Sequence, residues 1–505
     1  MTTPQELPLT TNSQTPDRLI IRGALSTAGG FAIRFGARFL FLFVAGHFYG
    51  AALFGAYSVA VAVVEALIGL AGLSLKKTLF DMLDRNQEEG RREPLHVVLD
   101  AVLLILAVGG SLAALVMAVA AAAPHHVLGQ ATATALFWLA PMIASQTLAD
   151  VLFTSTRWKN TVTAEVVGRS VVEPYALVAG AALGYICGIH EHGLILGYWL
   201  GNIALDAYAI SQVRRFYGGL HLRSYGFDSA ALGATVTSLL PNTTTEFASG
   251  VYARLDLYLV RILLGERWAG IYAMAQQVRT PVRQVRQSFD GLLVPLVSRT
   301  LTERGTTATQ NAIATVARLI LAIQLPILLL LAAGGASLLE LFGKGFGVAY
   351  WALLLLVLAE IINGSFGIGD LLFVYRRPAR GMRITLITAG VGLVAGYLLI
   401  EAFGITGGGL SVLLAYSTQA ALRRAALRAH FGSKVPLTHN AGPLLSATIA
   451  AGCVAAGNSI APSGLWLQAL IGGGSVAVYA GVLWIWVKLT GQKMSIVGFS
   501  AGGVS

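Results

Sequence analysis

The chain has 505 residues, of which only 12% are charged and 55% are hydrophobic. A soluble protein carries about a quarter charged residues, so this composition excludes a soluble enzyme and a disordered chain and indicates a polytopic membrane protein. Lys and Arg number 35 against 24 Asp and Glu, for a formal net charge of +11. In a membrane protein such an excess is explained by basic cytoplasmic loops, so nucleic acid is not an expected partner.

Residues 1–18 are polar and predict a disordered cytoplasmic tail without a signal-peptide pattern. After this tail, fourteen apolar stretches are each long enough for a membrane helix, which needs about 20 residues. Their expected ranges are 22–48, 53–79, 95–122, 131–156, 161–187, 193–213, 234–263, 268–297, 309–333, 347–373, 382–403, 408–428, 441–461 and 465–488. The predicted fold class is therefore all-α, a polytopic membrane protein with about 14 transmembrane helices.

The basic residues predict the orientation of these helices. Of the 35 Lys and Arg residues, we assign nine to the membrane interior and two to the loops of one side, which leaves 24, including those near the span ends, for the other side. By the positive-inside rule the basic side is cytoplasmic. Both termini are then cytoplasmic, with residues 491–505 as the C-terminal tail.

A shift of 215 residues aligns the turn after the first span with the turn after the seventh span. Gly50 then meets Gly265, and Gly55 meets Gly270. Because six spans separate the copies, the repeats are parallel and related by a pseudo-twofold axis along the membrane normal. This predicts two six-helix lobes plus two C-terminal helices, with an N-lobe at 19–215, a cytoplasmic linker at 216–232, a C-lobe at 233–430 and the last helices within 436–490.

The nine arginines that we assign to the membrane interior carry the functional information. They are Arg34, Arg38, Arg169, Arg254, Arg261, Arg279, Arg283, Arg286 and Arg318. A charged side chain at mid-helix costs about 2.5–3.5 kcal/mol or more, so it normally faces a bundle interior or a water-filled cavity. For Arg169, which has Glu165 and Glu173 one turn to either side, and for Arg318, a purely structural role explains the sequence equally well.

Helix eight contains the most specific pattern. Arg279, Arg283, Arg286 and Asp290 follow at i, i+4, i+7 and i+11, which places them on one stripe of the helix. Three neighbouring guanidinium groups repel one another unless an anion or water lies beside them, and a guanidinium binds two phosphate oxygens at once. The stripe therefore predicts a pyrophosphate-binding cavity. The alternative is that it lies at the cytoplasmic end of the helix and snorkels to lipid head groups.

Other expected spans carry polar groups that match this stripe. Helices one, two and seven hold Arg34 and Arg38, Glu65, and Glu246, Arg254 and Asp256, respectively. Since helices one and seven, and two and eight, correspond under the repeat, all four can face one central cleft. The carboxylates Glu65, Glu246, Asp256 and Asp290 are either ion-coupling groups or counter-ions of the arginines. Helix ten carries a weaker polar face, interpreted as packing or bilayer-edge residues, at Glu360, Asn363 and Asp370.

No catalytic motif accompanies these charges. The histidines at 125–126 and 190–192 lie in short loops without a metal-ligand frame, and no phosphate-binding Walker A sequence occurs. We therefore expect no enzyme activity, no catalytic or metal site and no cofactor. Coupling to an H+ or Na+ gradient stays open.

Three segments carry a resemblance that covers roughly residues 20–430: "GHFYGAALFGAYSVA", "YARLDLYLVRILLGERWAGIYAMAQQV" and "EAFGITGGGLSVLLAYSTQAALRR". They resemble polysaccharide-biosynthesis flippases, the lipid-linked oligosaccharide translocases of the multidrug/oligosaccharidyl-lipid/polysaccharide exporter superfamily. The resemblance implies a bacterial inner-membrane protein that carries an undecaprenyl-pyrophosphate-linked oligosaccharide, by alternating access, for lipopolysaccharide or exopolysaccharide synthesis. It implies membrane lipids, a polysaccharide polymerase and assembly proteins as partners. The implied cavity residues are Arg34, Arg38, Arg254, Arg279, Arg283 and Arg286.

Three other functions compete with this interpretation. A cation-coupled multidrug antiporter of the same superfamily exports cations, which a cleft with more arginines than carboxylates would repel. A membrane polysaccharide polymerase or ligase is expected to have a large periplasmic loop, whereas the outer loops expected here are short. A scaffold for a polysaccharide assembly complex would leave the buried charges without a use.

Overall fold

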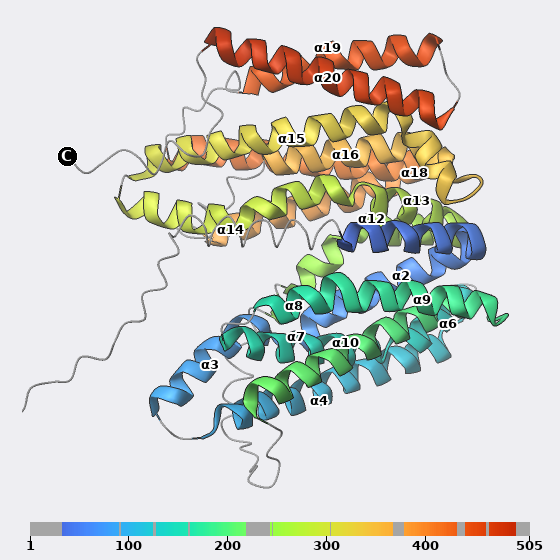
Figure 1. Cartoon of the computed structure of the whole chain (residues 1–505), viewed down its shortest axis with the longest axis vertical. Helices are drawn as coiled ribbons and strands as arrows, with labels where there is room; N and C mark the ends of the chain where they lie inside the picture. The colour runs from blue at the N-terminus through green and yellow to red at the C-terminus, as the bar shows by residue number, and fades with distance from the viewer. Residues whose placement is uncertain are drawn as a thin grey trace, which may run out of the picture. The chain divides into compact units, whose positions relative to one another are not determined.

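The computed structural model describes residues 33–89, 92–124, 128–159, 162–218, 243–244, 246–303, 305–366, 378–431, 440–460 and 464–490. Every regular element in these ranges is a helix (Figure 1), which confirms the predicted all-α class. The tails predicted at 1–18 and 491–505 and positions 219–232 of the predicted linker lie outside the described residues, as does the side chain of Asp290.

Ten helical stretches of the described chain are long and apolar enough to cross a membrane. Two of them, Ile33–Glu89 with 57 residues and Arg380–Ala429 with 50 residues, exceed twice the length of about 20 residues that one crossing needs. The chain is thus a polytopic membrane protein. The stretch 246–303 contains most of predicted span seven (234–263) and all of predicted span eight (268–297). It is mostly helical but is not among the ten, and it carries most of the predicted cavity arginines.

Contacts along the backbone divide the chain into two compact units, each built from several segments. The first comprises Met1–Leu42, Ala71–Ala113 and Pro141–Thr243, and the second comprises Phe43–Leu70, Ala114–Ala140 and Thr244–Ser505. The lobe boundaries expected from the sequence stay a prediction.

The first unit is a helix bundle. Its elements are α3 (Leu75–Glu89), the first part of α4 (Pro94–Ala122), α7 (Met142–Trp158), α8 (Val162–Val167), a π-helical turn (Gly168–Val172), α9 (Glu173–Ile186) and α10 (Gly193–Tyr217). Helices α9 and α10 lie side by side (Figure 1). Leu79 and Leu83 of α3 pack with Ile105 of α4, and Phe153 of α7 packs with Leu205 of α10. These two apolar clusters form the core.

Helix α3 is amphipathic and separate from the helix before it. Its leucines 75, 79 and 83 are buried, whereas Lys76 and Lys77 are exposed. A turn at residues 72–74 precedes it, where Leu73 (φ 46°) and Ser74 (φ 52°) adopt left-handed backbone conformations. Span two was expected to continue to residue 79, but this turn ends it at Ala71, because left-handed backbone cannot continue a right-handed helix.

The second unit contains the remaining helices. They are α2 (Gly50–Ala71), α6 (Gln130–Leu139), α12 (Leu255–Leu264), α13 (Glu266–Val278), α14 (Thr280–Glu303), α15 (Gly305–Phe342), α16 (Tyr350–Ser365), α18 (Pro378–Phe431), α19 (Ala441–Ile460) and α20 (Leu465–Thr490). Helix α15 contacts α14, α16, α19 and α20. Helix α18 breaks at Gly404 (φ 59°), and Ile384 packs near Ala426, so its two halves run antiparallel. The break falls between the spans expected at 382–403 and 408–428.

The repeat detected in the sequence appears in the backbone of the second unit. Gly50 (φ 77°, ψ 175°) precedes the body of α2, and Gly265 (φ 91°, ψ −178°) precedes α13. Such φ values favour glycine because it has no Cβ atom. The two equivalent glycines therefore break their helices in the same conformation.

The two equivalent turns also pack on each other. A Cβ atom on Gly55 would overlap the carbonyl oxygen of Glu266, and a Cβ atom on Gly270 would overlap the carbonyl oxygen of Ala51. Under the shift of 215 residues, Ala51 corresponds to Glu266 and Gly55 corresponds to Gly270. The contact of Gly55 with Glu266 therefore corresponds to the contact of Gly270 with Ala51. Close approach of helix backbones at small residues is the usual way in which membrane helices associate.

Substitution of either glycine by alanine should destabilise the protein. In both Gly55→Ala and Gly270→Ala the new methyl group meets backbone, which cannot move aside as a side chain can, and overpacking of this kind costs about 1–3 kcal/mol. Thermal or denaturant unfolding of the purified protein in detergent measures the loss. Gly473→Ala, where nothing lies within 4 Å of the new Cβ, is the control and should stay close to wild type. Equal stability of all three variants would contradict the packing.

Candidate functional site

The predicted arginine stripe begins where α13 meets α14. Arg279 lies between these helices with an α-helical backbone (φ −70°, ψ −17°). Its side chain is 4% exposed, and its Nη1 atom lies 3.8 Å from Oε1 of Glu360 on α16, which is 2% exposed. Neither of these two atoms has a hydrogen-bond partner. Glu360 is therefore a buried counter-ion of Arg279, whereas the sequence pattern indicated a packing or bilayer-edge residue.

A second buried carboxylate lies on α12. Asp256 accepts hydrogen bonds through Oδ2 from the hydroxyl of Tyr272 and from Nε2 of Gln276, each at 2.7 Å. Both donors belong to α13, and Tyr272 is completely buried. A buried charge is tolerated when it is hydrogen-bonded in this way, and the two bonds fix Asp256 next to Arg279.

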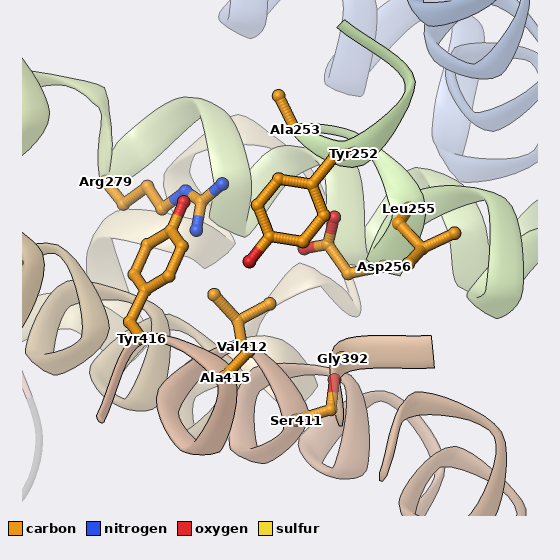
Figure 2. Close-up of a pocket in the computed structure, with 10 residues that line it drawn as sticks. All are labelled: Tyr252, Ala253, Leu255, Asp256, Arg279, Gly392, Ser411, Val412, Ala415 and Tyr416. Atoms are coloured by element: carbon orange, nitrogen blue, oxygen red, sulfur yellow. The ribbon is translucent and has the colours of Figure 1, made fainter. Parts of the chain in front are cut away.

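A small cavity lies between these groups (Figure 2). Its volume is about 30 Å³, and its polar lining comes from Tyr252, Asp256, Arg279, Ser411 and Tyr416. Figure 2 shows that the rings of both tyrosines and the guanidinium of Arg279 are directed into the same space. One water molecule needs about 10–15 Å³ by this measure. In this conformation the cavity therefore has room for about two waters or a small ion, and the pyrophosphate site predicted at the arginine stripe stays a prediction.

Two further arginines extend the cluster along α12 and α14. Arg254 donates a hydrogen bond from Nη2 to Oε2 of Glu65, at 2.8 Å, and this carboxylate is half exposed. Arg283 is partly buried, and its buried Nε atom has no hydrogen-bond acceptor. Arg283 lies within electrostatic range of Arg279, Glu360 and Arg254. Arg286, one turn further along α14, is also partly buried.

The remaining predicted residues belong to other segments of the chain. Arg34 is exposed and Arg38 is partly buried, and both belong to the first unit. Glu246 is partly buried in the second unit, with its backbone against Gly69 of α2. The backbone of Asp290 continues α14, and its side chain is outside the described residues.

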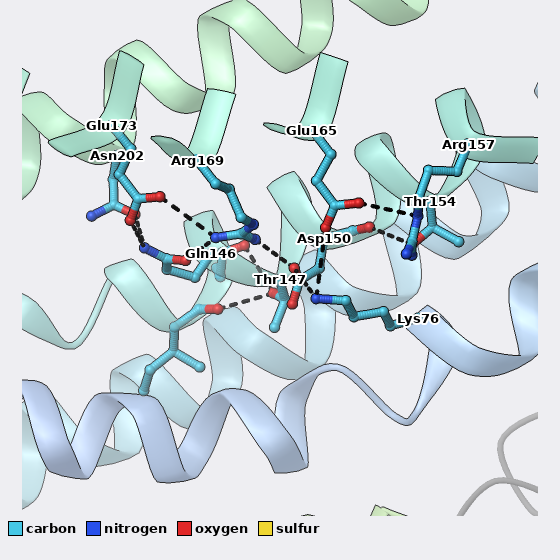
Figure 3. Close-up of polar contacts among 12 residues, drawn as sticks. Lys76, Gln146, Thr147, Asp150, Thr154, Arg157, Glu165, Arg169, Glu173 and Asn202 are labelled. Atoms are coloured by element: carbon cyan, nitrogen blue, oxygen red, sulfur yellow. Dashed lines mark hydrogen bonds and ion pairs between the residues drawn. The ribbon is translucent and has the colours of Figure 1, made fainter. Parts of the chain in front are cut away.

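In the first unit, arginines, a lysine and carboxylates form a network of ion pairs (Figure 3). Arg169, in the π-helical turn, donates to Asp150 of α7 and lies 3.6 Å from Glu173 of α9. Lys76 of α3 also contacts Asp150, at 3.2 Å. Glu165 pairs with Arg157 at 3.2 Å. Each of the cations named here has a carboxylate partner, so this network is of the structural kind anticipated for Arg169.

Sequence reasoning missed Asp150 because it lies on a different helix. The expected partners of Arg169 were its neighbours one turn away, and Glu173 is one of them. Asp150 is 19 residues earlier, and only the packing of α7 against the next helices brings it close. The available signal was a lone carboxylate within an expected span, which requires a partner.

Arg261, at the end of α12, belongs to a clamp and not to the arginine cluster. Its guanidinium donates to Thr132 Oγ1 at 3.1 Å, to Glu266 Oε1 at 3.1 Å and to the carbonyl of Leu128. Glu266 also accepts from the backbone N–H and hydroxyl of Thr132, at 3.1 and 2.8 Å. Glu266 thereby caps the N-terminus of α6, where backbone N–H groups favour a negative charge.

Comparison with known proteins identifies the fold. No protein-family model matches the chain, and no curated protein sequence matches it. Solved structures do match over most of their length, and they are membrane transporters. The chain is therefore a multi-pass membrane protein with the fold of these transporters, and this is the fold that the sequence resemblance predicted.

The similar structures include the lipid II flippase MurJ in an inward closed conformation, with a TM-score of 0.70 and 13% identity, over 92% of this chain and 99% of that chain. An inward-facing multidrug-resistance transporter of the MATE family has a TM-score of 0.65 and 12% identity, over 80% and 96%. A transporter of the same MOP superfamily from Pyrococcus furiosus, with a binding pocket described as reversed in polarity, has a TM-score of 0.59 and 12% identity, over 83% and 96%. The chain has the fold of these proteins.

Removal of Arg169 should destabilise the first unit. Arg169→Met leaves Asp150 and Glu173 facing each other with less positive charge. Since the Arg169 and Asp150 side chains are about a fifth exposed, we expect a loss of about 1–3 kcal/mol, less than the 3–5 kcal/mol typical of fully buried pairs. Unfolding of Arg169→Met, Asp150→Asn and the double variant gives the coupling energy. If the losses of stability in the two single variants add up to the loss in the double variant, there is no direct interaction between Arg169 and Asp150. Arg215→Met, at an exposed position, is the control.

The clamp should depend on the charge of Glu266. Glu266→Gln keeps the shape of the side chain but leaves the guanidinium of Arg261 without its carboxylate, and a hydrogen bond to a charged group contributes about 1.5–3 kcal/mol. We expect a loss of stability of that size in denaturant unfolding. Glu191→Gln, in an exposed loop, should have no effect. If Glu266→Gln were as stable as wild type, the clamp would be an incidental contact.

Proposed function

We propose that the protein translocates an undecaprenyl-pyrophosphate-linked oligosaccharide across the bacterial inner membrane, by alternating access, for cell-surface polysaccharide synthesis. The observation that carries this proposal is Arg283: a partly buried guanidinium, without a carboxylate ion pair in the described chain, one turn from Arg279. A buried cation requires a negative partner. The diphosphate of a lipid carrier is an anion that enters such a site from the membrane.

Arginine is suited to this ligand. Its planar fork donates two parallel hydrogen bonds to a phosphate, and its charge persists when it is removed from water. Arg283 and Arg286 follow Arg279 on one side of α14. A diphosphate offers two adjacent phosphates, so neighbouring guanidinium groups can each bind one.

The likeness to MurJ supports a lipid-linked substrate, since that protein is a lipid II flippase. A substrate of this kind places the chain in the inner membrane with cytoplasmic termini and the site opening first to the cytoplasm. It implies contact with membrane lipids and, on the other side, with a polysaccharide polymerase and assembly proteins. The proposal does not specify whether transport is coupled to an H+ or a Na+ gradient.

The second candidate is a cation-coupled multidrug antiporter, which the likeness to the MATE structures supports. Such a carrier needs carboxylates that can bind a cation. Asp256 already accepts two hydrogen bonds, and Glu360 is already paired with Arg279. Positive charge at Arg279 and Arg283 also opposes entry of a cationic drug. These contacts favour an anionic substrate.

The test is translocation in vesicles. The protein is reconstituted into liposomes with a fluorescent polyprenyl-diphosphate sugar, and a membrane-impermeant quencher reports how fast the label changes leaflet. Arg283→Ala should slow the rate at least about tenfold, since a hydrogen bond to a charged group is worth about 1.5–3 kcal/mol. Exposed Arg215→Ala on α10 should leave the rate unchanged. An unaffected Arg283→Ala variant, or proton-coupled efflux of cationic dyes by the wild type, would favour the second candidate.

A further inference from the structure

We propose that the clamp of Arg261, Glu266, Thr132 and Leu128 is the outer gate of the transporter. It holds the two predicted repeats together at the end expected to be periplasmic, and it must open before a substrate can leave there. The gate rests on the proposed function for its transport cycle, but its residues are distinct from the arginine cluster. All of them belong to the second unit.

The clamp joins segments of both predicted repeats. Leu128 and Thr132 come from the stretch 114–140, which the sequence assigns to the N-lobe, whereas Arg261 and Glu266 flank the turn between α12 and α13 in the predicted C-lobe. Four hydrogen bonds connect the two sides: Arg261 donates to Leu128 and Thr132, and Thr132 donates twice to Glu266. Alternating access is largely a movement of one repeat against the other. These bonds must therefore break whenever this end opens.

The tight glycine contact also crosses the repeats, and it shares a residue with the clamp. Gly55 packs on the backbone carbonyl of Glu266, and Gly270 packs on the backbone carbonyl of Ala51. Glycine and alanine carry little apolar side-chain area, and the cost of separating two surfaces grows with the apolar area that they expose. The contact therefore closes the space between the helices and can part at low cost.

These contacts gather at one end of the helices. They fall at the turns expected after spans one, three and seven, at 48–53, 122–131 and 263–268. Gly46, just before the first of these turns, packs on the carbonyl of Phe342, which precedes the turn after span nine. By the positive-inside rule all four turns are periplasmic. The second unit is thus held closed at its predicted outer end.

The polarity of the clamp suits a contact that opens and closes repeatedly. The side chains of Arg261 and Glu266 are 14% and 23% exposed, so water reaches the ion pair in the closed state. When the partners separate, water replaces their hydrogen bonds, and the net cost of each is far below its strength in isolation. A seal made of large apolar side chains would instead expose their whole area on opening.

Thiol labelling from the outer side measures this opening. The reporter is Ser58→Cys, in a protein that also carries Cys187→Ser and Cys453→Ser. Ser58 lies one turn from Gly55 on the same side of α2, is 8% exposed, and its hydroxyl has no hydrogen-bond partner in the described chain. A membrane-impermeant maleimide, added to right-side-out membrane vesicles, should react slowly with this cysteine. Glu266→Gln should raise the labelling rate at least about tenfold, because it weakens hydrogen bonds to a charged group.

Two controls separate opening of the gate from loss of stability. Arg169→Met, which should destabilise the first unit, and Glu191→Gln, in an exposed loop, should both leave the labelling rate unchanged. An unchanged rate in Glu266→Gln, or an equal increase in Arg169→Met, would overturn the gate. If Glu266→Gln does not fold, Thr132→Val replaces it, because it removes the hydroxyl from the clamp and keeps the charge of Glu266.

A covalent lock tests the role of the clamp in transport. In the same cysteine-free background, Thr132→Cys and Glu266→Cys are joined by a short bifunctional methanethiosulfonate reagent, and the fluorescent lipid is followed in vesicles as above. The lock should stop translocation and its reduction should restore it, whereas Thr132→Cys alone should be insensitive to the reagent. Translocation by the locked protein would overturn the gate and leave the proposed substrate intact. A wild type that does not translocate the lipid would overturn the proposed function, and the labelling rates would still decide the gate.

Discussion

A charge removed from water must find an opposite charge or a set of hydrogen bonds within a few ångströms. In this chain that requirement acts on a bundle in which only 12% of the residues are charged. Asp256 meets it with two donors from α13, and Arg169 meets it with two carboxylates from other helices. The positions of the helices are tied to these pairings, because a shift of one turn would separate the partners by about 5 Å.

The two units satisfy this requirement differently. In the first unit, Arg169 and Lys76 both pair with Asp150, so each of these cations has a carboxylate partner. In the second unit, the pairing of Arg279 with Glu360 is long, and Arg283 has no ion pair within the described chain. A cation paired with carboxylates of neighbouring helices holds those helices together, whereas a buried cation without an ion pair has binding energy left for a ligand. This contrast is the physical reason for proposing a structural role for the first cluster and a substrate-binding role for the second.

Much of the fold follows from hydropathy, because apolar length and turn residues are local properties of the sequence. The turn at Gly404 and the equivalence of Gly50 with Gly265 are of this kind. The positions of the membrane arginines could also be predicted from the sequence, because a charged residue within an apolar segment is easily identified. Their partners were not: Glu360 is 81 residues from Arg279, and a helical period cannot show which faces of two distant helices meet. The break at Leu73 and Ser74 was missed as well, because neither residue type favours left-handed backbone.

The contact between Gly55 and Gly270 is isologous, in the sense used for homodimers: one surface meets a copy of itself across a two-fold axis. A homodimer of half-length chains would form the same contact from one sequence. A residue larger than glycine at this position would then clash in both copies. When the two halves belong to one chain, equivalent positions can carry different residues wherever tight packing does not require glycine in both. Gly46, which packs against the carbonyl of Phe342, has Arg261 as its equivalent, bound to Leu128. Equivalent positions therefore hold a backbone packing contact at Gly46 and a charged side chain at Arg261, a difference that a symmetric dimer could not have.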